Sequence, residues 1–207
     1  MAALRRAKRS AERRGTPADL LVVGLGNPGE QYAGSRHNVG AQAVDVLVER
    51  HAGRLRSSKE QAMTDLLRLG DKRVAVAFPL TFMNESGRSV QLLVRRYGID
   101  DLARLVVVQD ELDLEPGQVR VKAGGGLAGH NGLRSIQSHL GSADFTRVRI
   151  GIGKPPSKER GADHVLRRVG KAERAELDIA VEIAADAVET IAAEGVEAAM
   201  QQINGSV

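Results

Sequence analysis

The sequence predicts a single α/β domain with a central mixed β-sheet flanked by α-helices. Six short apolar runs have the length and composition of strands, and segments with helical periodicity lie between them. Strands interleaved with helices are typical of helices packed on a sheet. The chain has 207 residues, enough for one sizeable core, so we expect one domain over residues 20–207.

The predicted strands are the apolar runs 20–24, 64–69, 74–78, 105–109, 119–122 and 147–152. Helical spacing of apolar residues predicts helices over about 37–51, 86–97 and 131–140. A long last helix repeats apolar residues at intervals of three and four: Leu177, Val181, Ala184, Val188 and Ile191. Gly195 ends or breaks that helix before a short final one. The polar segment 154–161 is expected to be a mobile loop and a candidate lid.

Residues 1–19 form a basic extension that we expect to be disordered. Glu12 and Asp19 oppose six basic side chains there: Arg5, Arg6, Lys8, Arg9, Arg13 and Arg14. The whole chain has 30 basic and 26 acidic residues, so 24 of each sign remain outside the extension. The net charge of +4 therefore belongs to the extension. Such a tail raises affinity for polyanions such as RNA, and an extension without a specific role is the alternative.

Composition excludes several classes of protein. There is no cysteine, which removes disulfides, thiolate metal sites and cysteine nucleophiles, and is compatible with a cytosolic location. No apolar run approaches a membrane span, and the N-terminus lacks the apolar region of a secretory signal. Aromatic residues are too few for a base-stacking platform, so phosphate contacts would dominate any binding of nucleic acid.

The glycine-rich segment 24–40 allows two interpretations. Three glycines match the GxGxxG pattern of dinucleotide-binding folds: Gly24, Gly26 and Gly29. In those folds the helix begins within the glycine turn, and an acidic residue follows about 20 positions later, after the helix. Here the candidates Asp45 and Glu49 fall inside the predicted helix. We therefore prefer the second interpretation, a rigid turn that presents Asn27 beside His37.

Two further site types have weak support. The run VVVQDE at 106–111 resembles the magnesium-binding strand of NTPases, but the GxxxxGK[ST] loop is absent. The five histidines form no HxxxH or HExxH pair. For Glu111 and Asp113, which follow Asp110, we prefer a solvated turn to a cation site. We therefore expect neither a metal nor a cofactor.

Three asparagines occur in glycine-flanked loops: Asn27, Asn84 and Asn131. Each alone is typical of a turn or a helix N-cap, and Asn84 and Asn131 stand where an N-cap would stand. Together with His37 and with Asp110 at a strand end, they indicate a hydrolytic site. Amides donate and accept hydrogen bonds, which suits an ester and a water. A carboxylate orients a histidine and makes it a better base.

Five segments, in order, resemble the signature segments of bacterial peptidyl-tRNA hydrolase: GLGNPGEQYAGSRHNVG, FPLTFMNESG, QDELDLEPG, KAGGGLAGHNGLRSI and FTRVRIGIGKPP. The resemblance covers about residues 20–203. It implies hydrolysis of the ester that joins a peptide to the 3′ end of tRNA, which recycles tRNA from stalled or aborted translation. It also implies a single α/β domain with a mixed sheet, no metal, and a monomer in the cytoplasm.

The resemblance further implies roles for individual residues. His37 would be the general base that activates water, and Asp110 its orienting partner. Asn27 and Asn84 would hold the end of the substrate and the reacting group, and Asn131 would position water and peptide backbone. The remaining matched positions are expected to contact the substrate: Tyr32, Phe82 and Met83 in the cleft, His130 beside them, and Lys122 and Arg149 on the tRNA 5′ phosphate.

Some positions depart from the family pattern. Gln109 stands where histidine or aspartate is usual, Ser35 replaces threonine, and Ala128 replaces a common glycine. The methyl group of Ala128 would stiffen its loop or demand a negative φ. Two alternatives remain open: an RNA-binding relative without hydrolysis, and a serine nucleophile at Ser35 or Ser86, neither of which lies in a GxSxG elbow.

Overall fold

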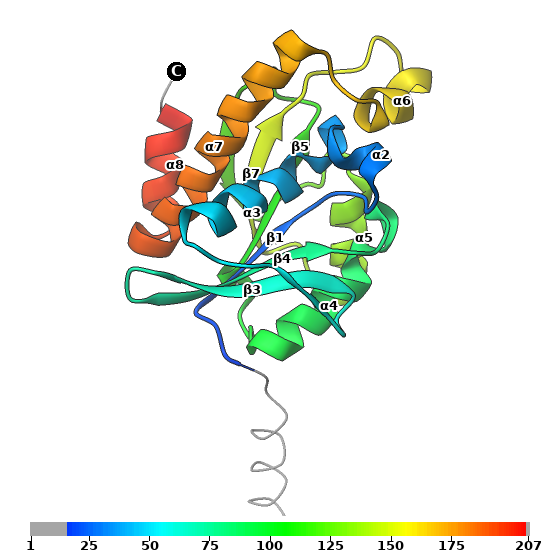
Figure 1. Ribbon diagram of the computed structural model, residues 1–207. Helices are drawn as coiled ribbons and strands as arrows, with labels where there is room; N and C mark the ends of the chain where they lie inside the picture. Colours follow the sequence, from blue (N-terminus) through cyan, green and yellow to red (C-terminus); the bar gives the residue numbers. More distant parts are fainter. Residues whose placement is uncertain (1–15, 206–207) are drawn as a thin grey trace, which may run out of the picture.

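The computed structural model describes residues 16–205, in which seven strands form one mixed sheet of order β2-β3-β4-β1-β5-β7-β6 (Figure 1). The strands are β1 (Leu20–Gly24), β2 (Arg56–Ser58), β3 (Ala62–Leu69), β4 (Lys72–Pro79), β5 (Leu105–Glu111), β6 (Val119–Ala123) and β7 (Thr146–Gly151). The α-helices are α2 (Glu30–Ala33), α3 (Val39–Arg50), α4 (Ser86–Tyr97), α5 (Asn131–Leu140), α6 (Gly161–Leu166), α7 (Lys171–Glu194) and α8 (Val196–Gly205). Short 3₁₀ turns are η1 (Arg36–Asn38), η2 (Met83–Glu85), η3 (Leu102–Arg104) and η4 (Lys158–Arg160). The predicted fold class is confirmed.

The centre of the sheet is parallel. β1 pairs in parallel with β4 and with β5, and β5 pairs in parallel with β7, whereas β2, β3 and β6 run antiparallel to their neighbours. The carboxyl ends of β1, β4 and β5 therefore meet at one edge of the sheet. Ligand sites of open α/β sheets form at such an edge, so the loops that follow these strands are where a site is expected.

Side chains alternate between two apolar layers. On β5, Val106 and Val108 pack with α3 and α7, while Leu105 and Val107 pack with α4 and α5. Figure 1 shows α3 and α7 together on one face of the sheet, with α4 and α5 on the other. The two layers bury the central strands on both sides, which gives the site loops a rigid support.

Glycines bring α3 unusually close to the sheet. A Cβ atom on Gly24 would lie 2.2 Å from the carbonyl oxygen of Gly40, and one on Gly40 would lie 2.2 Å from that of Val108. Only glycine permits this approach, which sets the start of α3 over β1 and β5. Gly24 thus has a packing role here, and α3 begins at Val39, well beyond the glycine turn.

Several boundaries differ from the expectation. Three short elements were not predicted, namely β2, α2 and α6, and η4 lies in the segment 154–161 that was expected to be loop throughout. Ala18 and Asp19, assigned above to the extension, belong to the folded body: Ala18 is buried, and their N–H groups donate to the carbonyls of Tyr97 and Arg73. The expectation of disorder for residues 1–15 lies outside the described residues.

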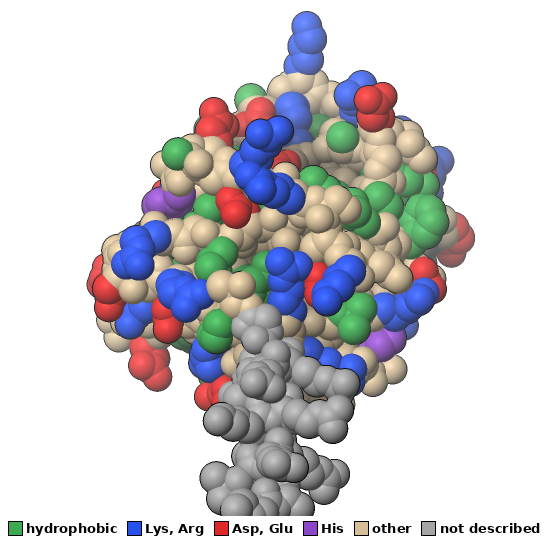
Figure 2. All heavy atoms as spheres, turned by 60° about the horizontal axis from the view of Figure 1, so that its bottom comes forward, with side chains coloured by type: hydrophobic (Ala, Val, Ile, Leu, Met, Phe, Trp, Pro, Cys, Tyr) green, Lys and Arg blue, Asp and Glu red, His purple; other side chains and the backbone are tan. Residues whose placement is uncertain are grey.

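The surface mixes both charge signs. On the face drawn in Figure 2, Lys and Arg side chains are interspersed with acidic and uncharged ones and do not form one basic patch. This agrees with the formal neutrality calculated for the chain outside its first 19 residues. Among residues 16–205 no helix is long and apolar enough to cross a membrane.

Candidate active site

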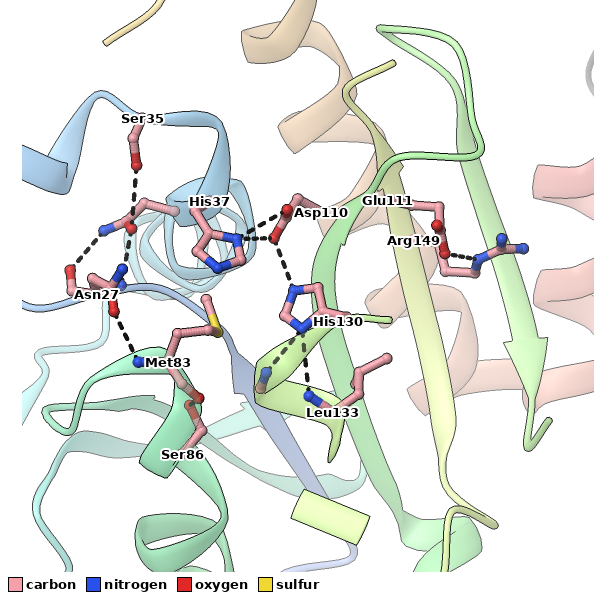
Figure 3. Close-up of polar contacts among 12 residues, drawn as sticks. Asn27, Ser35, His37, Met83, Ser86, Asp110, Glu111, His130, Leu133 and Arg149 are labelled. Carbon is pink, nitrogen blue, oxygen red and sulfur yellow. Dashed lines mark hydrogen bonds and ion pairs between the residues drawn. The ribbon is translucent and has the colours of Figure 1, made fainter. Parts of the chain in front are cut away.

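His37 and Asp110 meet at the carboxyl edge of the sheet. His37 lies on η1, just before α3, and Asp110 is near the end of β5. The Nδ1 atom of His37 lies 2.9 Å from Oδ1 and 3.0 Å from Oδ2 of Asp110, and both residues are buried (Figure 3). Because a carboxylate only accepts hydrogen bonds, Nδ1 carries the proton and Nε2 of His37 keeps its lone pair. Figure 3 shows this second nitrogen turned away from Asp110, on the side of Met83 and His130.

The two groups perturb each other's ionisation. Burial by itself lowers the pKa of His37, but the charge and hydrogen bond of Asp110 outweigh it and raise that pKa above its ordinary value. Burial raises the pKa of Asp110, yet the attraction of His37 and His130 is stronger and holds that pKa below its usual range. At neutral pH the carboxylate is therefore ionised, and the histidine is a strengthened base.

His130 also contacts this carboxylate. Its Nε2 lies 3.0 Å from Oδ1 of Asp110, and its Nδ1 accepts hydrogen bonds from the N–H groups of Gly132 and Leu133, at 3.1 and 3.4 Å. The residue was predicted to contact substrate; in the structure its polar atoms are engaged inside the protein. It is also the N-cap of α5, the place that the alternative interpretation gave to Asn131.

His37, Asp110 and His130 offer ligand atoms that all lie within 4.8 Å of one another, so the chain places one possible metal-binding group within residues 16–205. A metal on Nε2 of His130 would require the proton to move to Nδ1. Two backbone N–H groups already point at Nδ1, and they would lose their acceptor. The hydrogen bonds around His130 therefore favour a proton on its Nε2 atom over a metal ion at that atom.

Asn27 is held in place by its neighbours. Asn38 bonds to the backbone of Asn27 through both atoms of its amide, and Oδ1 of Asn27 accepts from the N–H of Met83 at 2.8 Å. The loops after β1 and β4 are thereby joined. The Nδ2 group of Asn27 has no hydrogen-bond partner within residues 16–205, which leaves it available to a ligand. Sequence reasoning missed Asn38, because an asparagine at a helix start resembles an ordinary N-cap.

Asn84 and Asn131 are exposed, and their amides make no hydrogen bond within the described part of the chain. Neither is an N-cap: Asn84 lies inside η2, Glu85 precedes α4, and Asn131 is the first residue of α5. The alternative of an N-cap therefore does not hold for either. Two amides that face solvent with no structural task are free to bind substrate.

A pocket of about 230 Å³ opens beside the two histidines. Four of the predicted site residues line it: His37, Asp110, His130 and Asn131. The apolar side chains in its lining are Leu112, Ala128, Ala162 and Val165. Asn27 does not line this pocket; it lines a separate one with Phe78. Of the predicted cleft residues, Met83 is buried and Phe82 is exposed at the start of η2, while Tyr32 is half-buried on α2.

One wall of the pocket is α6, which the sequence did not reveal. Arg36, next to His37, donates to the carbonyl of His164 on α6 at 2.7 Å and forms a two-pronged ion pair with Glu173 on α7. The ring of His164 lies 3.1 Å from the carbonyl oxygen of Gly153, beyond the end of β7. These bonds fasten α6 to the turn that carries His37. No apolar periodicity marks this helix, because none of its residues is buried.

The two predicted phosphate-binding residues lie outside this pocket. Lys122 is exposed at the end of β6, whereas Arg149 donates from Nε to Glu111 at 2.9 Å. The side chain of Glu111 is 2% exposed, so the prediction of a solvated turn is wrong for this residue. Asp113 does lie at the surface, where it pairs with Lys154. Glu111 offsets the charge of Arg149 and fixes its side chain.

The positions that depart from the family pattern lie in different environments in the structure. Gln109 is fully buried and its amide has no partner within residues 16–205; as a strand neighbour of Asp110 it faces the opposite side of the sheet. Ala128 has a φ of 49°, so of the two alternatives, a stiffened loop or a negative φ, the second is wrong. The hydroxyl groups of Ser35 and Ser86 donate to Asn38 and to the Met83 carbonyl, and neither is bonded to His37.

The chain is similar to known proteins along most of its length. A family model described as peptidyl-tRNA hydrolase matches residues 21–207. The chain is 52% identical over 177 residues to the peptidyl-tRNA hydrolase of Frankia alni, which covers 86% of this chain and 89% of the relative. It is 47% identical over 186 residues to that of Mycolicibacterium vanbaalenii, covering 89% and 96%. The crystal structure of peptidyl-tRNA hydrolase from Acinetobacter baumannii is similar with a TM-score of 0.85 and 38% identity, covering 92% of this chain and 97% of that one.

Proposed function

The chain belongs to the peptidyl-tRNA hydrolase family, and we propose that it cleaves the ester between a peptide and the 3′ end of tRNA with His37 as general base. The family and the related structures favour this activity over a dinucleotide-dependent oxidoreductase and over a non-catalytic RNA-binding protein. The observation that carries the residue assignment is the bond from Nδ1 of His37 to Asp110, which leaves Nε2 unprotonated beside the pocket.

The reaction follows from this proton arrangement. Nε2 of His37 removes a proton from a water molecule while the water oxygen attacks the ester carbonyl. Asp110 stabilises the imidazolium that forms and fixes its orientation. The proton is then available for the leaving 3′ oxygen of the tRNA. An ester is already an activated acyl group, so no covalent enzyme intermediate is needed, in keeping with the engaged hydroxyl groups of Ser35 and Ser86.

The free amides would stabilise the charge that develops on the carbonyl oxygen. Asn131 lines the pocket with His37, and its exposed amide offers an N–H donor to that oxygen or to the water. Nδ2 of Asn27 and the amide of Asn84 are the further donors on the loops after β1 and β4. Substrate contacts at Tyr32 and Phe82 would add apolar surface.

The tRNA itself would be held largely by its phosphates. Lys122 and Arg149 are proposed to contact the 5′ phosphate. Lys122 contributes a charge with no ion-pair partner within residues 16–205, and Arg149 a side chain oriented by Glu111. Binding should weaken as salt rises, by roughly one counterion per phosphate contact. We propose that the protein works as a monomer without a metal in the cytoplasm, where its substrate arises: one chain supplies every group named here, and the donors around His130 favour protons over a metal.

The proposal is tested by incubating the enzyme with N-acetyl-aminoacyl-tRNA and, separately, with unblocked aminoacyl-tRNA. Release of the blocked amino acid alone is expected, because only N-acetyl-aminoacyl-tRNA resembles the ester of a peptide with tRNA. Absence of release from the blocked substrate at low salt would refute the activity. Release of both at equal rates would refute the peptide specificity.

A further inference from the structure

We infer that His130 is a positioning residue that keeps the carboxylate of Asp110 oriented toward His37. The N-terminus of α5 holds His130 in one tautomer, and in that tautomer its Nε2 donates a hydrogen bond to Asp110. The kinetic consequence rests on the proposed function. The proton arrangement does not, and it can be measured without substrate.

The tautomer follows from the partners of the His130 ring. Nδ1 is 3.1 Å from the backbone nitrogen of Gly132 and 3.4 Å from that of Leu133, and both groups are donors. A ring nitrogen that accepts a hydrogen bond carries no proton, so the proton lies on Nε2. His130 therefore has an Nε2 N–H to donate to Asp110.

That N–H points at the carboxylate of the catalytic pair. Nε2 of His130 lies 3.0 Å from Oδ1 of Asp110, the same oxygen that lies 2.9 Å from Nδ1 of His37 (Figure 3). The side chains of Asp110 and His130 are 2% and 7% exposed, so water does not substitute for the bond. With donors on two sides, the carboxylate has one orientation, and it faces His37. Without His130 it can rotate and lose one of its two contacts with Nδ1.

The other charged groups near the pair are already engaged. Arg36 on η1 is bonded to Glu173 of α7 and to the α6 backbone. Glu111, which also lines the pocket, is paired with Arg149 of β7. The α6 residues that line the pocket carry no titratable group. The electrostatic environment of Asp110 is therefore set by the two histidines.

Two substitutions separate the contacts of His130. In His130→Asn, Oδ1 takes the place of Nδ1 and can still cap α5, but the side chain is too short to reach Asp110. In His130→Gln, the amide N–H stands near the place of Nε2 and can restore the bond to Asp110. His51→Asn is the matched control, since His51 follows the C-terminal end of α3 and contacts Glu189 of α7.

We expect His130→Asn to keep the melting temperature while kcat falls roughly tenfold or more, as for loss of one hydrogen bond to a charged group. The acid limb of kcat/KM should move to lower pH, because a carboxylate that has lost one of its contacts with Nδ1 holds the His37 proton less strongly. His130→Gln should recover part of kcat, and His51→Asn should behave as wild type.

Three results would overturn the inference. Wild-type kcat and acid limb in His130→Asn would mean that capping α5 is the whole role of the residue. A higher KM with unchanged kcat and acid limb would mean that His130 binds substrate. Nitrogen-15 shifts of His130 in the substrate-free enzyme are expected to show the Nε2–H tautomer. An Nδ1–H tautomer would refute the inference whether or not the enzyme cleaves the ester.

Discussion

Asn38 holds the backbone of Asn27 on both sides: its Oδ1 accepts from the Asn27 N–H and its Nδ2 donates to the Asn27 carbonyl, each at 2.9 Å. Both residues are buried. Because Asn38 directly follows His37, a single turn places the proposed base and fixes the glycine loop that presents the Asn27 amide. The spacing of these residues in the sequence thus has a structural reason.

Replacing Asn38 by aspartate should disturb this loop. A carboxylate oxygen would face the Asn27 carbonyl in place of the Nδ2 donor, leaving two acceptors opposed in a buried site. We expect the free energy of unfolding to fall by about 1–3 kcal/mol and kcat/KM to fall with it. Gln42→Glu is the control, because the Gln42 amide donates to the Ala33 carbonyl at an exposed position. Denaturant unfolding and steady-state kinetics measure both effects; equal losses in the two variants would contradict this role.

The pH dependence of kcat/KM reports the His37–Asp110 pair. Burial lowers the pKa of His37, but Asp110 outweighs it and raises that pKa above its ordinary value. The base acts in its unprotonated form, so the rate should fall as pH drops through a pKa higher than that of an ordinary histidine. Asp110→Asn removes the attracting charge and should move this limb to lower pH while kcat drops by about 10²-fold or more. An acid limb that stays in place in this variant would argue against the pairing.

Sequence patterns predicted most of the fold, because β1 and β5 are continuous apolar runs and α4 has apolar residues at helical spacing. They missed β2 and α6, whose residues are polar or exposed and whose positions depend on tertiary contacts. His37 and Asp110 were identified as candidates from their residue types and their positions in the sequence, after predicted strands. The bond from His130 to Asp110 joins residues 20 positions apart, and no local pattern reveals it. Glu111 seemed solvated for the same reason, since its partner Arg149 lies 38 positions away.

The ion pair between Arg36 and Glu173 should stabilise the wall of the pocket. The Arg36 side chain is 8% exposed, so Glu173→Gln leaves a largely buried charge with the His164 carbonyl as its remaining strong acceptor. We expect unfolding to become easier by about 1–2 kcal/mol. Glu182→Gln, in the exposed cluster around Arg50, should change stability by about 0.5 kcal/mol or less. Comparable effects of the two substitutions in urea denaturation would contradict the structural role.

Ala128 should be a site where glycine stabilises the protein. Its φ of 49° is in the left-handed region, which costs a residue with a Cβ about 1–2 kcal/mol. The greater conformational entropy of glycine in the unfolded chain offsets about 0.4–1 kcal/mol of this gain in stability. Ala128→Gly is therefore expected to raise the free energy of unfolding by about 0.5–1 kcal/mol. Ala123→Gly, outside the left-handed region, should lower it; a loss at both positions would show that the loop is unstrained.

The most direct test of the account compares wild type and His37→Ala in single-turnover cleavage of N-acetyl-aminoacyl-tRNA, with tRNA affinity measured on the same preparations. Removal of the base should slow cleavage by about 10²-fold or more and leave the affinity nearly unchanged. A His37→Ala enzyme that folds, binds tRNA and cleaves at the wild-type rate would show that His37 is not the base.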